Sequence, residues 1–330
     1  MTSFPALTRR RLLSTGAATI GLGAAGITPA FAQSTDVALQ LSWLHSVQFA
    51  GSYIAKQRGF WRDAGLNVSL NPGGPNAPVE PPVVAGRALI GISAADYASA
   101  AVAQGAPFKI IGVAMKKNPF AIASLPANPV RTPGDLLGKR IGMAIANTPV
   151  LQALCALNDI DINGIEIVPT QYDAAPLVNG QVDCLLCWAT DLPVAMAMQG
   201  IDSVTMLMAD HGYAVHSQTY IATLDSIANR RADVVGLLRG EVQGWAAYEA
   251  DTDAATDVTL AMFPDAGLDV ETQREQARRQ VPLMFTGAAD NPFGWFTDDS
   301  VAANLQTLAL LGREVSADLW DRSLLEEVYG

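Results

Sequence analysis

The feature that most constrains the fold of this chain is an alternation of short apolar segments with short helical segments. Strands are predicted at 37–41, 66–70, 88–92 and 109–114, and helices between them at 49–58, 79–86 and 96–104. Parallel strands need a long crossover connection, usually a helix. This order therefore predicts a parallel β-sheet with right-handed crossovers.

The same alternation continues beyond Pro119 and then gives way to helices. Further strands are predicted at 120–125, 140–144, 165–169, 182–187 and 204–208. After Thr223 the chain has apolar residues at three- and four-residue spacing, which predicts mostly helical stretches at 228–263, 270–285 and 299–312. The fold class we expect is α/β, with two lobes that are each a mainly parallel sheet flanked by helices.

A helical tail after two α/β units favours a discontinuous first lobe. We expect lobe one to comprise residues 33–118 plus 220–330, and lobe two to comprise residues 119–219. The chain then crosses twice between the lobes, and two crossing segments make a hinge. The cleft between such lobes is the natural place for a ligand.

The first 32 residues have the pattern of an export signal. Arg9, Arg10 and Arg11 precede an apolar run rich in Ala and Gly, which ends at the small-residue motif Ala30-Phe31-Ala32. This pattern indicates a twin-arginine (Tat) signal peptide cleaved after Ala32, and hence a protein of the periplasm. The alternative is an uncleaved N-terminal anchor.

Composition and motif searches exclude several classes of protein. The 330 residues carry a formal net charge of −11, so a nucleic-acid partner is not expected, because phosphate binding needs clustered Lys and Arg. Half of the residues are hydrophobic and 16% are charged, which argues for a folded core rather than disorder. No dinucleotide-binding glycine motif, Walker motif or nucleophile elbow is present. We expect no cofactor, no metal and a monomer.

The three cysteines do not form a metal or redox motif. Cys184 and Cys187 are three residues apart on a predicted strand, so their side chains point to opposite faces. A buried role is expected for both, and a disulfide from Cys155 to either one stays open. The three histidines show no metal-ligand spacing.

Several short motifs, taken in order, resemble one family. They are Trp43-Leu44-His45, Gln48-Phe49-Ala50-Gly51, Gly59-Phe60-Trp61, Ala64-Gly65-Leu66-Asn67-Val68, the block from Thr132 to Gly142, and Gly180-Gln181-Val182-Asp183. They resemble the substrate-binding proteins of ABC importers related to thiamine-pyrimidine (NMT1/THI-like) and alkanesulfonate/taurine receptors. The resemblance implies a type II periplasmic binding fold, a permease and an ATPase as partners, and no chemistry on the ligand.

Three candidate ligand residues follow the first predicted strand. Trp43 comes just after a predicted parallel strand, and ligands of open α/β sheets bind at the carboxyl ends of such strands. The indole ring of Trp43 suits stacking on a flat molecule. A packed Trp beneath the first helix is the alternative. Gln48 and Phe49 stand where pyrimidine-binding relatives tend to carry Asn and His, and this departure weighs against a pyrimidine.

Four more candidates begin helices. Asp96 and Tyr97 follow the third predicted strand, at a helix start whose N–H groups favour an anion or a carbonyl oxygen. Asn147 and Thr148 have the same placement in lobe two. For Asp96, and equally for Asn147 and Thr148, the alternative is a helix cap.

The remaining candidates lie in lobe two and at the hinge. Trp188, Thr190 and Asp191 follow a strand, where Trp188 would face Trp43 and Asp191 would accept a hydrogen bond from an amine or ring N–H. Asp191 has a capping role as its alternative. Asn118 and Tyr213 lie in the two crossing segments and either touch the ligand or serve only the hinge.

Three functions are compatible with these residues. The first is a non-enzymatic periplasmic receptor for a small flat heterocycle, such as a thiamine-pyrimidine precursor or riboflavin; within it an alkanesulfonate or taurine ligand is the alternative. The second is an enzyme like the eukaryotic thiamine-pyrimidine synthases of the wider family, but their lysine and histidine align with Ser93 and Tyr97 here. The third is a receptor that works without a transporter.

Overall fold

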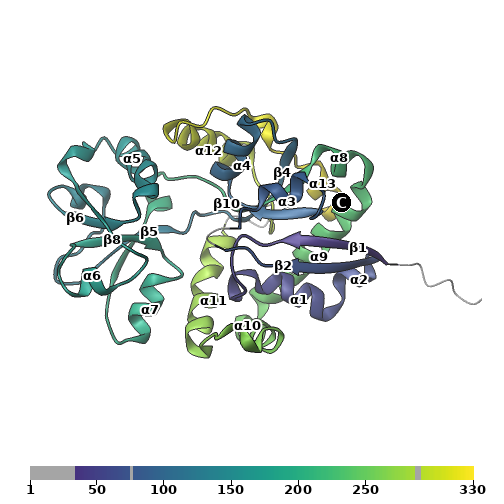
Figure 1. The fold of residues 1–330 in the computed structure, drawn as a ribbon, viewed down its shortest axis with the longest axis horizontal. Coiled ribbons are helices and arrows are strands. Elements are labelled where there is room, and N and C mark those ends of the chain that lie inside the picture. Colours follow the sequence, from purple (N-terminus) through teal and green to yellow (C-terminus); the bar gives the residue numbers. More distant parts are fainter. Residues whose placement is uncertain (1–33, 75–76, 287–290) are drawn as a thin grey trace, which may run out of the picture. The chain divides into compact units, whose positions relative to one another are not determined.

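The computed structural model describes residues 34–74, 77–286 and 291–330 (Figure 1). The predicted signal peptide and its cleavage site after Ala32 lie outside the described residues. None of the helices described is both long enough and apolar enough to cross a bilayer.

The first sheet has five strands in the order β2-β1-β3-β10-β4. β1 runs parallel to β2 and β3, and β10 is antiparallel to both of its neighbours. Its strands are β1 (Thr35–Gln40), β2 (Leu66–Asn71), β3 (Ile90–Ser93), β4 (Phe108–Met115) and β10 (Ser217–Thr223). The chain thus returns to this sheet after it has built the second one.

The second sheet repeats this plan in the order β7-β6-β8-β5-β9. β6 runs parallel to β7 and β8, and β5 is antiparallel to β8 and β9. Its strands are β5 (Phe120–Ser124), β6 (Arg140–Met143), β7 (Glu166–Pro169), β8 (Cys184–Trp188) and β9 (Val204–Leu207). Two mainly parallel five-stranded sheets with flanking helices confirm the expected fold class.

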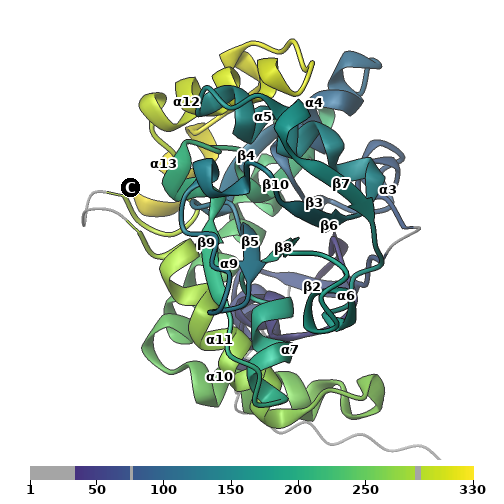
Figure 2. The ribbon, with the colours of Figure 1, turned by 90° about the vertical axis from the view of Figure 1, so that its left-hand side faces the viewer.

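Two segments of the chain connect the two sheets. On each sheet they lie at the edge where the parallel strands end. One runs from Met115 to Phe120, and the other runs from Leu207 to Ser217. Met115 pairs with Ser217 in the first sheet, and Phe120 pairs with Trp188, the last residue of β8, in the second. The carboxyl ends of both sets of parallel strands therefore lie next to the same two connections, as seen from the side of the second sheet in Figure 2.

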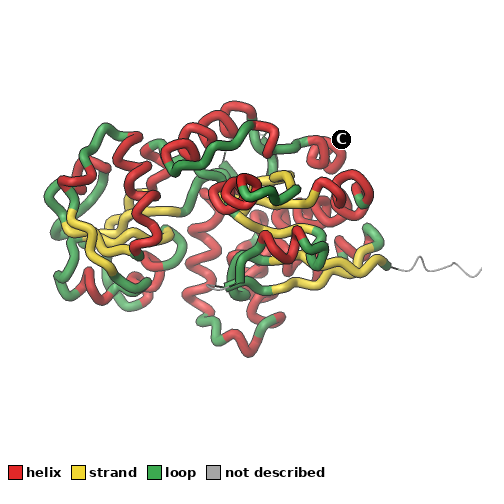
Figure 3. The backbone as a smooth tube through the Cα atoms, turned by 45° about the horizontal axis from the view of Figure 1, so that its top comes forward, coloured by secondary structure: helices red, strands yellow, loops and turns green. Residues whose placement is uncertain are grey.

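Helices flank the strands of both sheets (Figure 3). Those before β10 are α1 (Ala50–Arg58), α2 (Phe60–Asp63), α3 (Glu80–Val84), α4 (Ala95–Ala103), α5 (Thr148–Leu157), α6 (Ala175–Val178) and α7 (Leu192–Met198). Those after it are α8 (Leu224–Asn229), α9 (Arg231–Ala250), α10 (Thr252–Met262), α11 (Val270–Met284), α12 (Asp298–Leu310) and α13 (Ser323–Tyr329). Single 3-10 turns include η1 (Val47–Phe49), directly before α1.

The C-terminal helices differ in what they contact. α9 and α10 pack against α1, and α13 packs against α9 and β4, so these three complete the core of the first sheet. α11 contacts η1 on the first sheet's side and α7 on the second sheet's side, and α12 contacts α5. Two late helices therefore contact elements of both halves.

The packing of α1 on α9 depends on two glycines. A Cβ atom placed on Gly244 of α9 would lie 2.0 Å from the carbonyl oxygen of Gly51 on α1. Real Cβ atoms do not approach a carbonyl so closely, so only glycine permits this spacing of the two helices. The ring of Trp245 is fully buried beside this contact, and its atoms would clash with a side chain at Gly51.

The sequence prediction that residues 228–263 are mostly helical is confirmed. The structure has three helices there, and the last of them, α10, begins after Asp251, whose side chain accepts the backbone N–H of Ala254 at 2.9 Å. Asp is a favourable N-cap, so the chain starts a new helix instead of extending α9. β10, which begins at Ser217, was not among the predicted strands.

Candidate ligand-binding site

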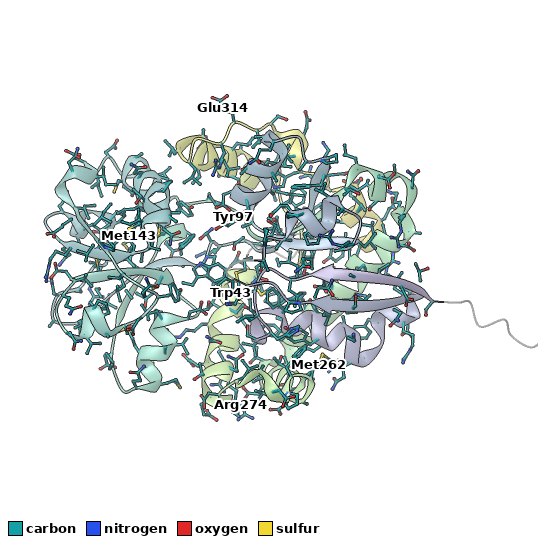
Figure 4. The ribbon with its side chains drawn as sticks, in the orientation of Figure 1. Trp43, Tyr97, Met143, Met262, Arg274 and Glu314 are labelled. Carbon is teal, nitrogen blue, oxygen red and sulfur yellow. The ribbon has the colours of Figure 1, made fainter. Side chains whose placement is uncertain are left out.

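Six short segments follow the carboxyl ends of the parallel strands and carry most of the candidate residues. We call them the edge segments: residues 41–46, 72–74 and 94–97 on the first sheet, and 144–148, 170–173 and 189–191 on the second. Three of their aromatic side chains are well exposed: Trp43 at 45%, Tyr97 at 67% and Tyr172 at 60%. Figure 4 shows Trp43 and Tyr97 at the end of the first sheet that faces the second. Exposed aromatic rings at strand ends are candidates for stacking on a ligand.

Side chains of α11 hold the edge segment that carries Trp43 in place by hydrogen bonds. The backbone N–H of Val47 donates to Oε1 of Gln273 at 2.9 Å, and Nε2 of Gln280 donates to the Val47 carbonyl at 3.4 Å. His45 stacks on Phe263 with ring centroids 3.7 Å apart. The loop that presents Trp43 is thus held in place by hydrogen bonds to both the N–H and the carbonyl of Val47, and by the stacking of His45 on Phe263.

A row of aromatic rings runs from the second connection to the second sheet. The ring of Phe120 makes edge contacts with Tyr213 on one side, at 6.2 Å, and with Trp188 on the other, at 6.3 Å. The backbone N–H of Trp188 donates to the hydroxyl of Tyr172 at 2.7 Å. Four aromatic residues from four parts of the chain are therefore adjacent.

Sequence reasoning missed Tyr172 in this row. Tyr172 follows the strand β7, as Trp43 follows β1 and as Trp188 ends β8. The position after a parallel strand was the available signal, and it applied equally to this residue.

Asn118 fastens the two connections to each other. Its Nδ2 donates to the carbonyl of Val215 at 2.8 Å, and its Oδ1 accepts the backbone N–H of Phe120 at 2.9 Å. The side chain is buried, with both its polar ends occupied. This is the hinge placement that the sequence left open beside ligand contact.

Asp96 and Tyr97 begin α4 beside the second connection. The backbone N–H of Ala95 donates to the carbonyl of His216 at 3.0 Å, which ties the start of the helix to that connection. Burial raises the pKa of the Asp96 carboxyl, and the nearby N–H of Tyr97 partly offsets this. The N-cap position of α4 is Ala94, so Asp96 does not cap the helix as the alternative supposed.

Asp191 lies at the start of α7 and contacts the other half of the molecule. Nε2 of Gln276 on α11 donates to its Oδ1 at 3.4 Å. Burial raises the pKa of Asp191 to about 6, partly offset by the side chain of Thr190. Asp191 occupies the N-cap position, but its side chain makes no capping hydrogen bond.

The remaining candidate residues from the sequence lie either in the core or nearer the surface. The Phe49 side chain is fully buried in the core of the first sheet, so the expectation that it faces a ligand does not fit this structure. Gln48 is half-buried. Asn147 makes no capping bond, and the Thr148 hydroxyl donates to the carbonyl of Ile145 at 2.7 Å.

The edge segments contain no Lys and no Arg. Their charged side chains are three carboxylates: Asp96, Asp173 and Asp191. Lysines occur nearby in the first connection, but Lys117 pairs with Asp210 at 2.7 Å and Lys116 donates to the backbone of Pro292 at 2.9 Å. The local field therefore favours a neutral or positively charged ligand.

No thiol is available to this site. Cys155, Cys184 and Cys187 are all buried and free, so the disulfide that the sequence left open is not formed. Burial raises the pKa of each of the three thiols, which opposes formation of a nucleophilic thiolate. In the part of the chain that the structure describes, no three His, Cys, Asp or Glu side chains gather as metal ligands.

Two mainly parallel sheets, joined by two connections beside the carboxyl ends of their strands, are the architecture of periplasmic solute-binding proteins. The aliphatic sulphonate binding protein SsuA of Escherichia coli has this fold, with a TM-score of 0.64 and 16% sequence identity over 84% of this chain and 86% of SsuA. The chain belongs to the NMT1/THI5-like family, whose model matches residues 46–255. The family resemblance seen in the sequence is confirmed.

Two further similarities bear on what the fold can do. The chain is 25% identical over 263 residues to the riboflavin-binding protein RibY of Chloroflexus aurantiacus, covering 75% of this chain and 72% of RibY. The desulfurization enzyme DszB shares the fold with a TM-score of 0.58 and 14% identity, over 89% of this chain and 99% of DszB. The same fold thus serves both binding proteins and an enzyme.

Proposed function

We propose that this protein is the periplasmic solute-binding component of an ABC importer and binds a small flat heterocycle between the edge segments of its two sheets, without chemistry. The ring would stack on Trp43 from the first sheet and on Trp188 from the second. A permease and an ATPase would be its partners, and export through the Tat route would deliver it to the periplasm as a monomer.

The observation that carries this proposal is the unequal burial of the tryptophans. Trp61 and Trp245 are almost completely buried, whereas Trp43 is 45% exposed at a strand end. Exposing so large an apolar surface costs free energy that a stacked ligand would recover. The similarity to a riboflavin-binding protein supports a flat heterocycle of flavin or pyrimidine type.

The charges of the site support a ring rather than a sulfonate as the ligand. A sulfonate needs cationic or N–H donors, and the edge segments supply no Lys or Arg but do supply three carboxylates. Ser93 and Tyr97 stand where the thiamine-pyrimidine synthases of the wider family carry lysine and histidine, so the groups for that chemistry are missing at these two positions. A neutral or cationic ring is therefore the ligand class that we favour.

The experiment is a thermal-shift and fluorescence titration of the purified protein with riboflavin, thiamine, an aminopyrimidine and taurine. A ligand at one hundred times its dissociation constant adds about 2.7 kcal/mol to the free energy of unfolding. We expect one ring compound to bind and Trp43→Ala to abolish that binding. Leu224→Ala, which removes a side chain of similar exposure on α8, is the matched control and leaves binding unchanged. Binding of taurine alone, or of no ring compound, contradicts the proposal.

A further inference from the structure

One hydrogen bond joins the two halves of the molecule away from their two connections. Nε2 of Gln276, on α11 of the first half, donates at 3.4 Å to Oδ1 of Asp191, at the start of α7 in the second half (Figure 1). Among the residues that the structure describes, the other hydrogen bonds between the halves all involve a connection, as where Lys117 pairs with Asp210 at 2.7 Å. The bond from Gln276 is therefore a separate contact between the halves.

The helix that supplies Gln276 is fixed to the first half. The hydroxyl of Tyr248 on α9 donates to the carbonyl of Ala277 at 2.6 Å, and the N–H of Val47 donates to Gln273 at 2.9 Å. Gln273 in turn donates to Oε1 of Gln276 at 2.7 Å, which orients the amide so that its Nε2 faces away from Gln273. Any movement of the second half therefore takes place against a fixed donor.

The contact lies at a distance from the hinge. Near the end of α11, the carbonyl of Leu283 accepts the N–H of Lys117 in the first connection at 3.0 Å. Gln276 lies seven residues earlier in the same helix, which is about 10 Å along its axis. A rotation of the halves about the connections therefore separates Gln276 from Asp191 while Leu283 stays beside Lys117.

The carboxyl of Asp191 has weak partners in this contact. It accepts a long hydrogen bond from the neutral amide of Gln276, and Thr190 is the other group that favours its ionised form. The titratable groups beside it are the Tyr172 phenol and the Cys187 thiol, whose pKa values its charge raises. None of these four groups is a cation, so none of them neutralises the carboxylate.

The charged side chains of α11 are paired elsewhere. Arg279 pairs with Glu275 on the same helix at 2.8 Å. Arg274 and Arg278 reach acids of α10 at 3.2 and 2.9 Å. These pairs leave the contact with Asp191 to the neutral amide of Gln276.

Opening and ionisation are therefore linked at Asp191. Burial raises the pKa of its carboxyl to about 6 in this structure, whereas a carboxyl that water reaches keeps its ordinary value of 3.8. Separation of α7 from α11 brings water to this carboxyl. The ionised form consequently favours the open arrangement, and the protonated form favours the closed one.

We propose that the hydrogen bond between Gln276 and Asp191 is a proton-controlled latch, which holds the two halves closed while the carboxyl is protonated and releases them when it ionises. This inference goes beyond the proposed function, since it concerns the ligand-free protein. It also has a consequence for binding. The apparent affinity of a receptor scales with the fraction of molecules in the competent closed form, so ligands of the cleft bind more tightly in acid.

The experiment measures the distance between the halves in the ligand-free protein by electron paramagnetic resonance of two spin labels. The labels are attached to Met198→Cys on α7 and Val270→Cys at the start of α11, both exposed positions. The three native cysteines are buried and do not compete for the label. Labels at Val178→Cys and Met198→Cys, both in the second half, form the control pair.

Distances are recorded at pH 5 and pH 8 in the wild-type background and in three variants. Asp191→Asn imitates the protonated acid, and Gln276→Leu removes the donor. Asp173→Asn is the matched control, because this acid also follows a strand of the second sheet but accepts the N–H of Ala175 at 3.1 Å. Burial also raises the pKa values of Asp96 and Glu241, so Asp191→Asn is the variant that assigns the effect.

The expected result is a change in the ratio of short to long distances. In the wild type this ratio falls by about tenfold from pH 5 to pH 8, which is the change given by a carboxyl with a pKa of about 6 when closed and 3.8 when open. Asp191→Asn keeps the high ratio at both pH values, and Gln276→Leu lowers the ratio at pH 5. Asp173→Asn behaves like the wild type, and the control pair does not change.

Three outcomes overturn the inference. They are a wild-type ratio that is equal at pH 5 and pH 8, a pH dependence that survives in Asp191→Asn, and wild-type ratios in Gln276→Leu at both pH values. No ligand is present in these measurements, so each of the three rejects the latch and leaves the proposed function standing. Loss of the proposed function is read separately, from the titrations of the wild type and Trp43→Ala.

Discussion

Gln276 on α11 and Asp191 at the start of α7 are joined by a hydrogen bond of 3.4 Å, although the two helices belong to different halves of the molecule. Gln276 in turn accepts a hydrogen bond at 2.7 Å from Gln273, which holds Val47 behind the Trp43 loop. Side chains of α11 thus contact both the loop that presents Trp43, on the first sheet, and Asp191, on the second sheet.

The acid at one end of this contact makes stability depend on pH. Burial raises the folded-state pKa of Asp191 to about 6, above its ordinary value of 3.8. The folded protein therefore binds this proton more tightly than the unfolded chain, and the stability that it contributes is present below pH 4 and is lost as the pH rises through 6. The groups that act on this carboxyl are Thr190 and Gln276, with Tyr172 and Cys187 nearby.

We expect Asp191→Asn to remove this dependence. At pH 7 the variant should be more stable than the wild type by about 1–3 kcal/mol, and below pH 4 the two should differ little. Urea unfolding followed at pH 3.5, 5 and 7 measures the difference. A variant that is less stable than the wild type at pH 7 but not at pH 3.5 would mean that Asp191 stabilises the fold in its charged form.

The two glycines between α1 and α9 allow a test of packing. Gly244→Ala places a Cβ atom 2.0 Å from the Gly51 carbonyl, so the helices must separate, and we expect a loss of about 3 kcal/mol or more. Gly236→Ala in the same helix is the control, since its nearest neighbour would be the Cβ of Ala64 at 3.2 Å. Because alanine is the better helix former, the control should lose little or gain stability. Melting temperatures of the two variants give the answer.

The sequence predicted the fold well because hydrophobic periodicity is a local signal. Short apolar strands with helices between them gave both sheets, and the position after a parallel strand pointed to Trp43 and Trp188. Phe49 was chosen because it stands where relatives carry a polar ligand residue, and that alignment could not tell that an apolar side chain at this position faces the core. Sequence reasoning also passed over Tyr172.

Contacts between distant parts of the chain carry no local signal at all. Gln273 and Gln280 fasten Val47 from more than two hundred residues away, and nothing in their surroundings in the sequence distinguishes them from surface glutamines. The pairing of Asp191 with Gln276 is hidden for the same reason. Long-range polar contacts of this kind emerge only once the helices are placed.

Glu241 is a buried acid in the core of the first sheet, and its role is structural. One of its oxygens, Oε2, accepts from Ser52 at 3.0 Å, from Tyr220 at 2.6 Å and from Trp245 at 3.0 Å, while Oε1 has no partner among the described residues. We expect Glu241→Ala to strand three buried donors and to cost about 3–5 kcal/mol. Glu241→Gln keeps one oxygen acceptor and should cost clearly less. Guanidinium unfolding measures the free energy of unfolding of both variants. Equal losses of stability in the two would mean that the three donors require the negative charge of Glu241.

The last prediction concerns how α11 positions the Trp43 loop. Gln280→Leu keeps the volume of the side chain but removes the donor to the Val47 carbonyl and to the Tyr248 hydroxyl. Gln276→Leu removes the contact with Asp191 and the acceptor of Gln273 Nε2, but no hydrogen bond to Val47 itself. We expect Gln280→Leu to cost about 1–3 kcal/mol, because it removes two buried hydrogen bonds, and to weaken ring ligands by moving Trp43. Gln276→Leu should leave stability within about 0.5 kcal/mol of the wild type. Trp fluorescence titrations and melting curves of the two variants separate these effects. Unchanged ligand affinity in Gln280→Leu, with its stability lowered as expected, would show that Trp43 does not depend on α11 for its position.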